Sequence, residues 1–294
     1  MTAIGYLVDA VSLGVIYALI AVSVGLVFGV LRQVNLAQGE VIAFGAYSLW
    51  LMRGLPTALA IVCCFFVCIA ASLVLQVVVF RPMRGASPLT TLIVTFGVSY
   101  ALEAVWLMVF GPNGNPVTPL SWLNDTAVGG QIALRWITLV EIGVGVVLFG
   151  GLYLVLFKSA LGVRMRAAAE DFRTARLIGV RIDRVVTWAF VLSGVTAAIV
   201  AVLDTVQFPL VTPSFGLTLL VTAFVGVVLG GVDQLGRATA GGFIIGFVNS
   251  ILGSVVPEQS LVFVPSLTFV FVIVVLLLRP DGLFAPRGSG VERV

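Results

Sequence analysis

Histidine is absent from this chain of 294 residues, and lysine occurs only once, as Lys158. Without histidine, the chain can form neither a Ser-His-Asp triad nor a histidine-ligated metal site. A phosphate-binding loop of the form G-x-x-x-x-G-K-[ST] needs glycine before its lysine, whereas Phe157 precedes Lys158. These absences argue against an enzyme. They predict that the chain holds no cofactor and hydrolyses no nucleotide through such a loop.

Cysteine is scarce as well. The three cysteines, Cys63, Cys64 and Cys68, all lie in one apolar run with no carboxylate near them. A free cysteine in such surroundings usually behaves as a small buried apolar residue. We therefore expect three packing residues here rather than the ligands of a metal.

Charged residues make up only 10% of the chain, and hydrophobic residues make up 60%. A bilayer core about 30 Å thick takes roughly 20 apolar residues per helix. Charge-free runs of that length recur along the chain, and they are too unbroken for the alternating strands of a membrane β-barrel. The sequence predicts an all-α fold, that is, a polytopic helical membrane protein forming a single transmembrane domain over residues 1–294.

The apolar runs predict eight spans, near residues 10–31, 57–80, 89–110, 135–157, 185–205, 215–232, 236–254 and 261–278. The stretch 36–50 is short for a full crossing. It is either a broken or re-entrant segment, which leaves eight spans, or a ninth crossing. No basic residue precedes Arg32, so we interpret the first run as a retained span rather than a secretion signal. The charge of Arg32 favours nine spans.

Basic residues fall mainly on one side of this arrangement. Arg53 and Arg135 lie in the outer segments, whereas 14 of the 16 basic residues lie in the segments assigned to the inside. Because short cytoplasmic loops are rich in lysine and arginine, we expect a cytoplasmic C-terminus and an N-terminus outside. The net charge of +3 then reflects topology, and it gives no reason to expect nucleic acid as a partner. The inner basic residues are Arg32, Arg81, Arg84, Lys158, Arg164, Arg166, Arg173, Arg176, Arg181, Arg184, Arg237, Arg279, Arg287 and Arg293.

Several polar residues fall within the predicted membrane segments. Charge is costly there, so such residues usually face a cavity or a partner. Glu40 follows Asn35 and Gln38 in the short segment, and Glu103 lies deep in the 89–110 span. For Glu103, a role in a solute pathway and a structural hydrogen bond both stay open.

Two further carboxylates, Glu141 and Asp204, lie near the ends of their spans, and we expect both to be interfacial. Glycines recur in the last third of the chain, where close helix packing is their expected role. They are Gly226, Gly230, Gly231, Gly241, Gly242 and Gly246.

The one substantial inner loop predicts an amphipathic helix over residues 163–178, with Gly179 as its stop. Glu170 can pair with Arg166 and Arg173 on its charged face. The helix either rests on anionic lipid or is presented to a cytoplasmic partner, and charge periodicity does not separate the two. Its apolar stripe at helical spacing consists of Met165, Ala168, Phe172 and Ala175.

Sequence motifs along nearly the whole chain resemble those of the branched-chain amino-acid permease family (the LivH type). The longest is RAAAEDFRTARLIGVRIDRVVTWAFVLSGVTAAIVAVL, which looks like the family's coupling loop and the span after it. VNLAQGE at residues 34–40 and RPM at residues 81–83 agree. AFVGVVLGGVDQLGRATAGG at residues 223–242 and RPDGLF at residues 279–284 follow in the same order.

The resemblance implies a permease subunit of an ATP-binding-cassette importer in the bacterial cytoplasmic (inner) membrane. Its expected partners are the lipid bilayer, a second related permease, two cytoplasmic ATPases that bind ATP and Mg, and a periplasmic solute-binding protein. The helix at about 163–178 would then couple the permease to an ATPase. The residues that match the coupling motif are Arg166, Ala168, Glu170, Asp171, Ala175 and Gly179.

The chain departs from the family pattern at three positions that bear on the pathway. Gln38 replaces a histidine that the family usually carries, Glu103 replaces a glutamine-like residue, and Thr222 replaces a basic residue. Branched-chain amino acids are the expected solutes, and urea, short amides or aromatic acids are the alternatives. A self-contained secondary transporter is a more distant alternative, with Glu40, Glu103 and Asp204 as its candidate ion site. The expected pathway residues are Asn35, Gln38, Glu40, Glu103 and Thr222.

Overall fold

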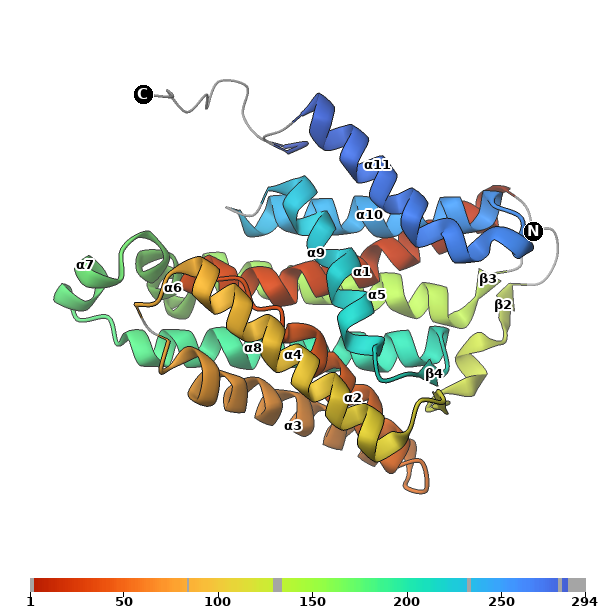
Figure 1. Ribbon diagram of the computed structural model, residues 1–294, viewed down its shortest axis with the longest axis horizontal. Helices are drawn as coiled ribbons and strands as arrows, with labels where there is room; N and C mark the ends of the chain where they lie inside the picture. The colour runs from red at the N-terminus through yellow and green to blue at the C-terminus, as the bar shows by residue number, and fades with distance from the viewer. Residues whose placement is uncertain (1–2, 84, 129–133, 232–233, 280–281, 285–294) are drawn as a thin grey trace.

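The computed structural model describes residues 3–83, 85–128, 134–231, 234–279 and 282–284 as a bundle of helices (Figure 1). Seven helical segments are long and apolar enough to cross a membrane, and α9 is a shorter apolar helix. The prediction of an all-α polytopic membrane protein is confirmed. The predicted basic positions Arg84, Arg287 and Arg293 lie outside the described residues, as do parts of the 223–242 and 279–284 motifs.

The long segments match the predicted spans to within a few residues, except at the first span, which begins earlier than expected. Two of them continue beyond the α-helix as short π-helices, η1 (Gln76–Phe80) after α3 and η3 (Leu154–Lys158) after α5. The α-helices of these seven segments are α1 (Ala3–Leu31), α3 (Thr57–Leu75), α4 (Pro88–Phe110), α5 (Trp136–Tyr153), α8 (Ile182–Gln207), α10 (Leu235–Val255) and α11 (Val264–Leu278).

Two helices are too short to span a bilayer as straight helices of ordinary length. α2 (Gln38–Leu51) has 14 residues, as the sequence predicts for the short segment. α9 (Phe215–Gly230) has 16 residues and lies within the predicted span over 215–232, but it is shorter than the seven long segments. Gly231 ends α9 with a φ of 104°, a conformation that glycine adopts without steric cost.

α1 and α8 occupy the centre of the bundle. For α1, 83% of its most apolar 18-residue stretch is buried, and for α8 the share is 67%. α10, α9, α8 and α5 all pack against α1. In α3, α4, α5, α10 and α11 only 17–28% of the corresponding stretch is buried, so most of their apolar side chains point outward, as lipid contact requires.

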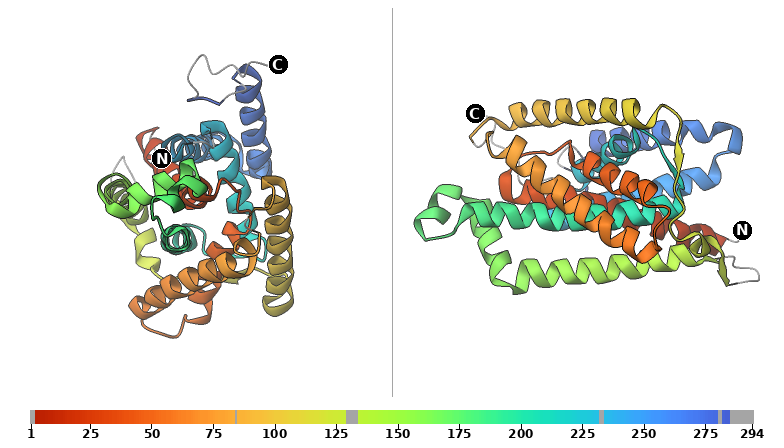
Figure 2. Two further views of the ribbon diagram at one scale, coloured as in Figure 1. Left: turned by 90° about the vertical axis from the view of Figure 1, so that its left-hand side faces the viewer. Right: turned by 90° about the horizontal axis from the view of Figure 1, so that it is seen from below.

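The two ends of the bundle carry different structures (Figures 1 and 2). α6 (Ala160–Glu170) and α7 (Phe172–Leu177) project at one end. The 3-10 helix η2 (Ser121–Asn124) lies in the segment between α4 and α5, and the 3-10 helix η4 (Glu258–Phe263) leads into α11. At the other end, β1 (Asn115–Pro116) pairs antiparallel with β4 (Leu210–Val211), and β2 (Thr126–Val128) pairs with β3 (Leu134–Arg135).

α2 and α9 cross with their backbones in contact. A Cβ atom added to Gly39 would lie 2.3 Å from the carbonyl oxygen of Gly216, and one added to Gly216 would lie 2.3 Å from that of Gly39. Glycines also join α9 to α10, where a Cβ on Gly241 would lie 2.0 Å from the carbonyl oxygen of Gly226. The packing role predicted for the glycines of the last third is therefore confirmed at these positions.

We expect Gly216→Ala to destabilise the fold by about 3 kcal/mol, because neither backbone at the crossing can move away without disturbing its own helix. Gly97→Ala is the matched control, since nothing lies within 4 Å of its added Cβ on α4. Alanine there should leave stability unchanged or raise it, because alanine favours the helix by up to about 1 kcal/mol. Thermal unfolding in detergent measures the stability of both variants. Equal unfolding midpoints for Gly216→Ala and Gly97→Ala would contradict the backbone contact between α2 and α9.

Candidate functional site

The start of α2 is held by a network of buried polar side chains. The Nδ2 of Asn35 donates to Oε1 of Gln38 at 3.2 Å, and Nε2 of Gln38 donates to the hydroxyl of Ser23 at 2.8 Å. Ser23 and Ser193 bond each other's backbone carbonyls, at 3.0 Å and 2.9 Å. Asn35 and Gln38, both predicted to line the pathway, therefore lie within the packing between α1, α2 and α8. The amide of Gln38 serves as donor and acceptor at once, which suits this place in the network.

Glu40 of α2 is hydrogen-bonded to two side chains of α4. Its side chain is fully buried, and its carboxylate accepts hydrogen bonds from the Ser99 hydroxyl at 2.9 Å and from Nε1 of Trp106 at 2.8 Å. Trp106 stacks on Tyr47 with ring centroids 4.7 Å apart, and Tyr47 stacks on Phe110 at 4.2 Å. Such hydrogen bonds satisfy the carboxylate and join the two helices at a point where water is excluded.

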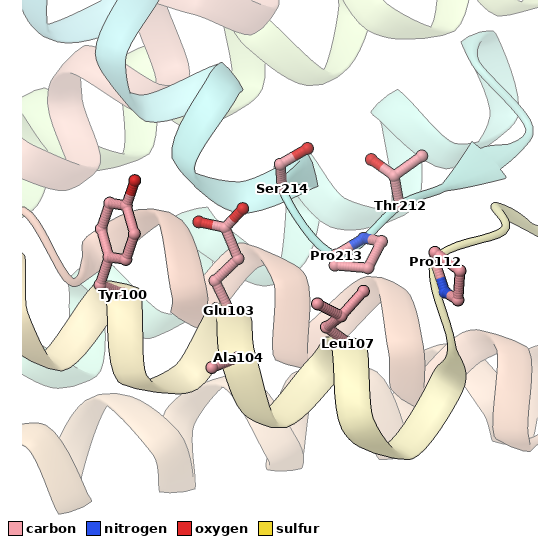
Figure 3. Close-up of a pocket in the computed structure, with 8 residues that line it drawn as sticks. All are labelled: Tyr100, Glu103, Ala104, Leu107, Pro112, Thr212, Pro213 and Ser214. Atoms are coloured by element: carbon pink, nitrogen blue, oxygen red, sulfur yellow. The ribbon is translucent and has the colours of Figure 1, made fainter.

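Glu103 belongs to a different environment, an open pocket of about 480 Å³ between α4 and the segment that leads into α9 (Figure 3). Its carboxylate points across this pocket toward Ser214, the residue before α9 (Figure 3). Of the expected pathway residues, only Glu103 lines the pocket. The residues that line it are Tyr100, Glu103, Ala104, Leu107, Pro112, Thr212, Pro213 and Ser214.

Thr222 does not join Glu103. Its hydroxyl donates to the carbonyl of Thr218 at 3.0 Å, within its own helix α9. It lies eight residues beyond Ser214 in the chain, about two helical turns further along α9. The structure thus distributes the expected pathway residues over four places: the buried network, the α2–α4 contact, the pocket and, for Thr222, α9.

Glu141 and Asp204 are buried inside the bundle, so neither carboxylate is solvated as an interfacial position predicts. Glu141 is 0% exposed and Asp204 is 2% exposed. Ser12 of α1 donates a hydrogen bond to Glu141, and α5 approaches α1 closely because Gly145 leaves room for Val15. Hydropathy does not reveal this contact, since Ser12 and Glu141 are 129 positions apart. In the described part of the chain, no group of three or more acidic, cysteine or histidine side chains is placed to hold a metal.

The predicted helix over 163–178 is two helices rather than one. α6 ends at Glu170, Asp171 is extended with φ −154° and ψ 116°, and α7 follows. The carboxylate of Asp171 accepts hydrogen bonds from the amide and hydroxyl of Thr174, at 3.2 Å and 2.6 Å. Asp171 therefore caps α7, and this local bonding competes successfully with a continuous helix.

The buried face predicted for this segment is confirmed. Met165, Ala168 and Ala175 are each no more than 3% exposed, and Phe172 is partly buried. α6 packs on α1, α8 and η3. The predicted stop at Gly179 is also confirmed: it has a φ of 86° and lies in a pair of hydrogen bonds that closes α7, from its own amide to Arg176 and from the Val180 amide to Ala175.

The outer face of α6 and α7 combines charge with exposed apolar side chains. Leu177 is 83% exposed and Ile178 is 71% exposed. Arg166 donates to the carbonyl of Leu156 and lies over the ring of Phe157. Glu170 is exposed, and the side chain of Arg173, its predicted partner, lies outside the described part. At the junction with the bundle, Nε of Arg32 donates to the carbonyl of Ala169 at 3.3 Å.

We expect Glu40→Ala to destabilise the chain by about 2–3 kcal/mol, because it leaves the buried Ser99 hydroxyl and Trp106 indole N–H without their hydrogen-bond acceptor. Glu103→Ala, which removes a carboxylate from an open pocket on the same helix pair, should cost less than about 0.5 kcal/mol. Thermal unfolding of the two purified variants in one detergent compares them. Similar losses would show that burial and hydrogen bonding do not distinguish these two carboxylates.

Comparison with known proteins gives the chain a family. Residues 6–279 match the family described as the permease component of the branched-chain amino acid transport system. The chain is similar to the high-affinity branched-chain amino acid permease proteins BraD of Pseudomonas aeruginosa, at 30% identity over 94% of each chain, and LivH of Escherichia coli K12, at 30% identity over 94% of this chain and 93% of LivH.

A more distant likeness extends to another kind of import system. The autoinducer 2 import system permease protein LsrC of Yersinia pestis is 26% identical over 46% of this chain and 34% of LsrC. The match that covers almost the entire chain is the one to the branched-chain amino acid system. The family match over residues 6–279 and the similarity to BraD and LivH along nearly the whole chain show that this chain belongs to the family of non-catalytic permease components of branched-chain amino acid transport systems.

Proposed function

We propose that the chain is one of two permease subunits of an ATP-driven importer for branched-chain amino acids. The main support for the proposal is the position of the α6–α7 unit. It projects at one end of the bundle, and its buried face packs on the central helices α1 and α8. Two cytoplasmic ATPases, which bind ATP and Mg, and a solute-binding protein on the opposite face complete the assembly. The outward apolar faces of the bundle are covered by lipid and by the second permease.

The α6–α7 unit is suited to transmit movement from an ATPase to the pathway. Met165 and Ala168 anchor α6, and Arg32 ties the end of α1 to Ala169. A displacement of α6 therefore moves α1, the helix that most of the bundle contacts. Leu177 and Ile178 project from the end of α7 and offer an apolar contact to the ATPase. Closure of the ATPase dimer would shift the permease between outward and inward access as a rigid-body change.

The chain crosses the inner membrane nine times in this proposal, with its N-terminus outside and its C-terminus in the cytoplasm. Arg32 donates to the carbonyl of Ala169 and Gln33 donates to the carbonyl of Ala86 at 3.4 Å, so α1 ends beside the end of α6 and the start of α4. α3 ends there too, which means that residues 32–56 traverse the bundle between α1 and α3. Non-helical backbone at residues 32–37 supplements the short helix α2, an arrangement tolerated where it is buried in protein.

Glu103 is the residue through which the solute pathway is best tested, since it alone among the expected pathway residues lines the pocket. Asn35, Gln38 and Glu40 act in this proposal by holding α2 in place beside it. The same importer architecture would serve urea, short amides or aromatic acids, and these are the alternative solutes.

Affinity purification of the chain from its native membrane tests the assembly. We expect a second permease and two P-loop ATPases to remain bound, and we expect solute uptake by the cells to stop when ATP is depleted. Recovery of this chain alone, with uptake that continues after ATP depletion, would favour a self-contained secondary transporter and overturn the proposal.

Leu177→Asp should lower ATPase recovery at least tenfold, because it places a charge at the apolar end of α7. Trp122→Ser is the control: Trp122 is also an exposed apolar residue, at 57%, but it lies in η2, in the segment between α4 and α5 that we assign to the outside. Quantitative immunoblotting of the co-purified ATPase compares the two. If both variants retain the ATPase fully, α7 is not the coupling contact.

A further inference from the structure

The pocket beside α4 contains one carboxylate and no basic side chain among its lining residues. Glu103 supplies the negative charge, and Tyr100, Thr212 and Ser214 supply hydroxyl groups. The remaining lining residues are apolar or proline. A carboxylate without a basic partner attracts a cationic nitrogen, and neighbouring hydroxyls can accept its remaining hydrogen bonds.

The position of Glu103 distinguishes it from the other carboxylate that reaches α4. Glu40 is fully buried, and both of its oxygens accept hydrogen bonds from α4. Glu103 is partly exposed and points into the pocket, with Ser214 on the opposite wall (Figure 3). Its charge is therefore available to a solute, whereas that of Glu40 is committed to holding the helices together.

We propose that this pocket binds the ammonium group of the transported solute, with Glu103 as the counter-ion and Leu107 and Pro213 as the apolar surface for the side chain. The inference rests on the proposed import function and adds the chemical group that the pathway recognises. The volume of the pocket, about 480 Å³, lies within the range of small-molecule sites, roughly 300–1,000 Å³. The site selects for solutes that carry an ammonium group over those that do not.

The charge of the pocket separates the candidate solutes. A branched-chain amino acid presents an ammonium group to Glu103 and an aliphatic side chain to Leu107. Urea and short amides have no positive charge, so they can donate hydrogen bonds to Glu103 but lack the attraction between opposite charges that an ammonium group adds. A deaminated acid keeps the carboxylate of the amino acid but lacks the ammonium group, so nothing offsets its repulsion from Glu103 in a pocket that has no basic lining residue.

Uptake by cells that carry the altered chain at its own locus tests the inference, with L-leucine, its deaminated analogue 4-methylpentanoate and the neutral isovaleramide as probes. We expect the unaltered chain to prefer leucine. Glu103→Gln should raise the KM for leucine on the order of tenfold, because it replaces a charged acceptor of the ammonium group by a neutral amide oxygen. It should also reduce the preference for leucine over both other probes, and Glu103→Asp should restore part of that preference.

Asp125→Asn is the matched control, because it removes one exposed carboxylate between α4 and α5 that does not line the pocket. It should leave the KM and the preference unchanged. The amount of each variant in the membrane is measured in parallel, and if Glu103→Gln does not accumulate, Glu103→Asp and Leu107→Ala provide the comparison. Leu107→Ala should weaken leucine uptake while keeping the preference for the ammonium group.

Unchanged KM and preference in Glu103→Gln, with uptake still dependent on ATP, would overturn the inference and leave the import function standing. So would a preference of the unaltered chain for 4-methylpentanoate or isovaleramide. Uptake that does not depend on ATP would instead overturn the import function, whatever the effect of Glu103. The two failures are therefore distinguishable in one set of experiments.

Discussion

No water is available in the hydrocarbon core of a bilayer, so a polar group placed there is costly unless it finds a partner within the protein. This constraint explains the arrangement around α2. Asn35, Gln38, Ser23 and Ser193 satisfy one another where three helices meet, and Glu40 is satisfied by Ser99 and Trp106. These bonds let a helix of 14 residues with non-helical backbone before it lie inside the bundle.

Close backbone contact is the second means by which the short helices are held. Gly39 and Gly216 meet where α2 crosses α9, and glycines of α9 meet those of α10. Without a hydrophobic driving force between helices in lipid, such contacts supply van der Waals packing that larger side chains would prevent. The start of α9 is thereby fixed beside α4, and the pocket of Glu103 lies between these two elements.

The α6–α7 end and the pocket end are joined by α1 and α8. α6 rests on both helices, and the buried network at Ser23 and Ser193 links both to α2. A movement applied at α6 therefore has a continuous packed route toward the helices around the pocket. Rigid connection of this kind is the physical basis of the coupling that we propose, and the carboxylate of Glu103 is the group whose surroundings would change with it.

The sequence by itself determined the membrane class, the positions of the spans, the apolar stripe of the inner loop and the stop at Gly179, because each depends on neighbouring residues. Only the tertiary structure decided which face of each span is buried. It separated Glu40 from Glu103, and it buried Glu141 and Asp204, which span position had suggested were interfacial. Ser12 reaches Glu141 across 129 positions, and hydropathy along the chain carries no information about such a partner. The break between α6 and α7 at Asp171 is partly predictable from the sequence. Its Asp-x-x-Thr capping signal is local, but the periodic apolar stripe continues on both sides and favours one continuous helix.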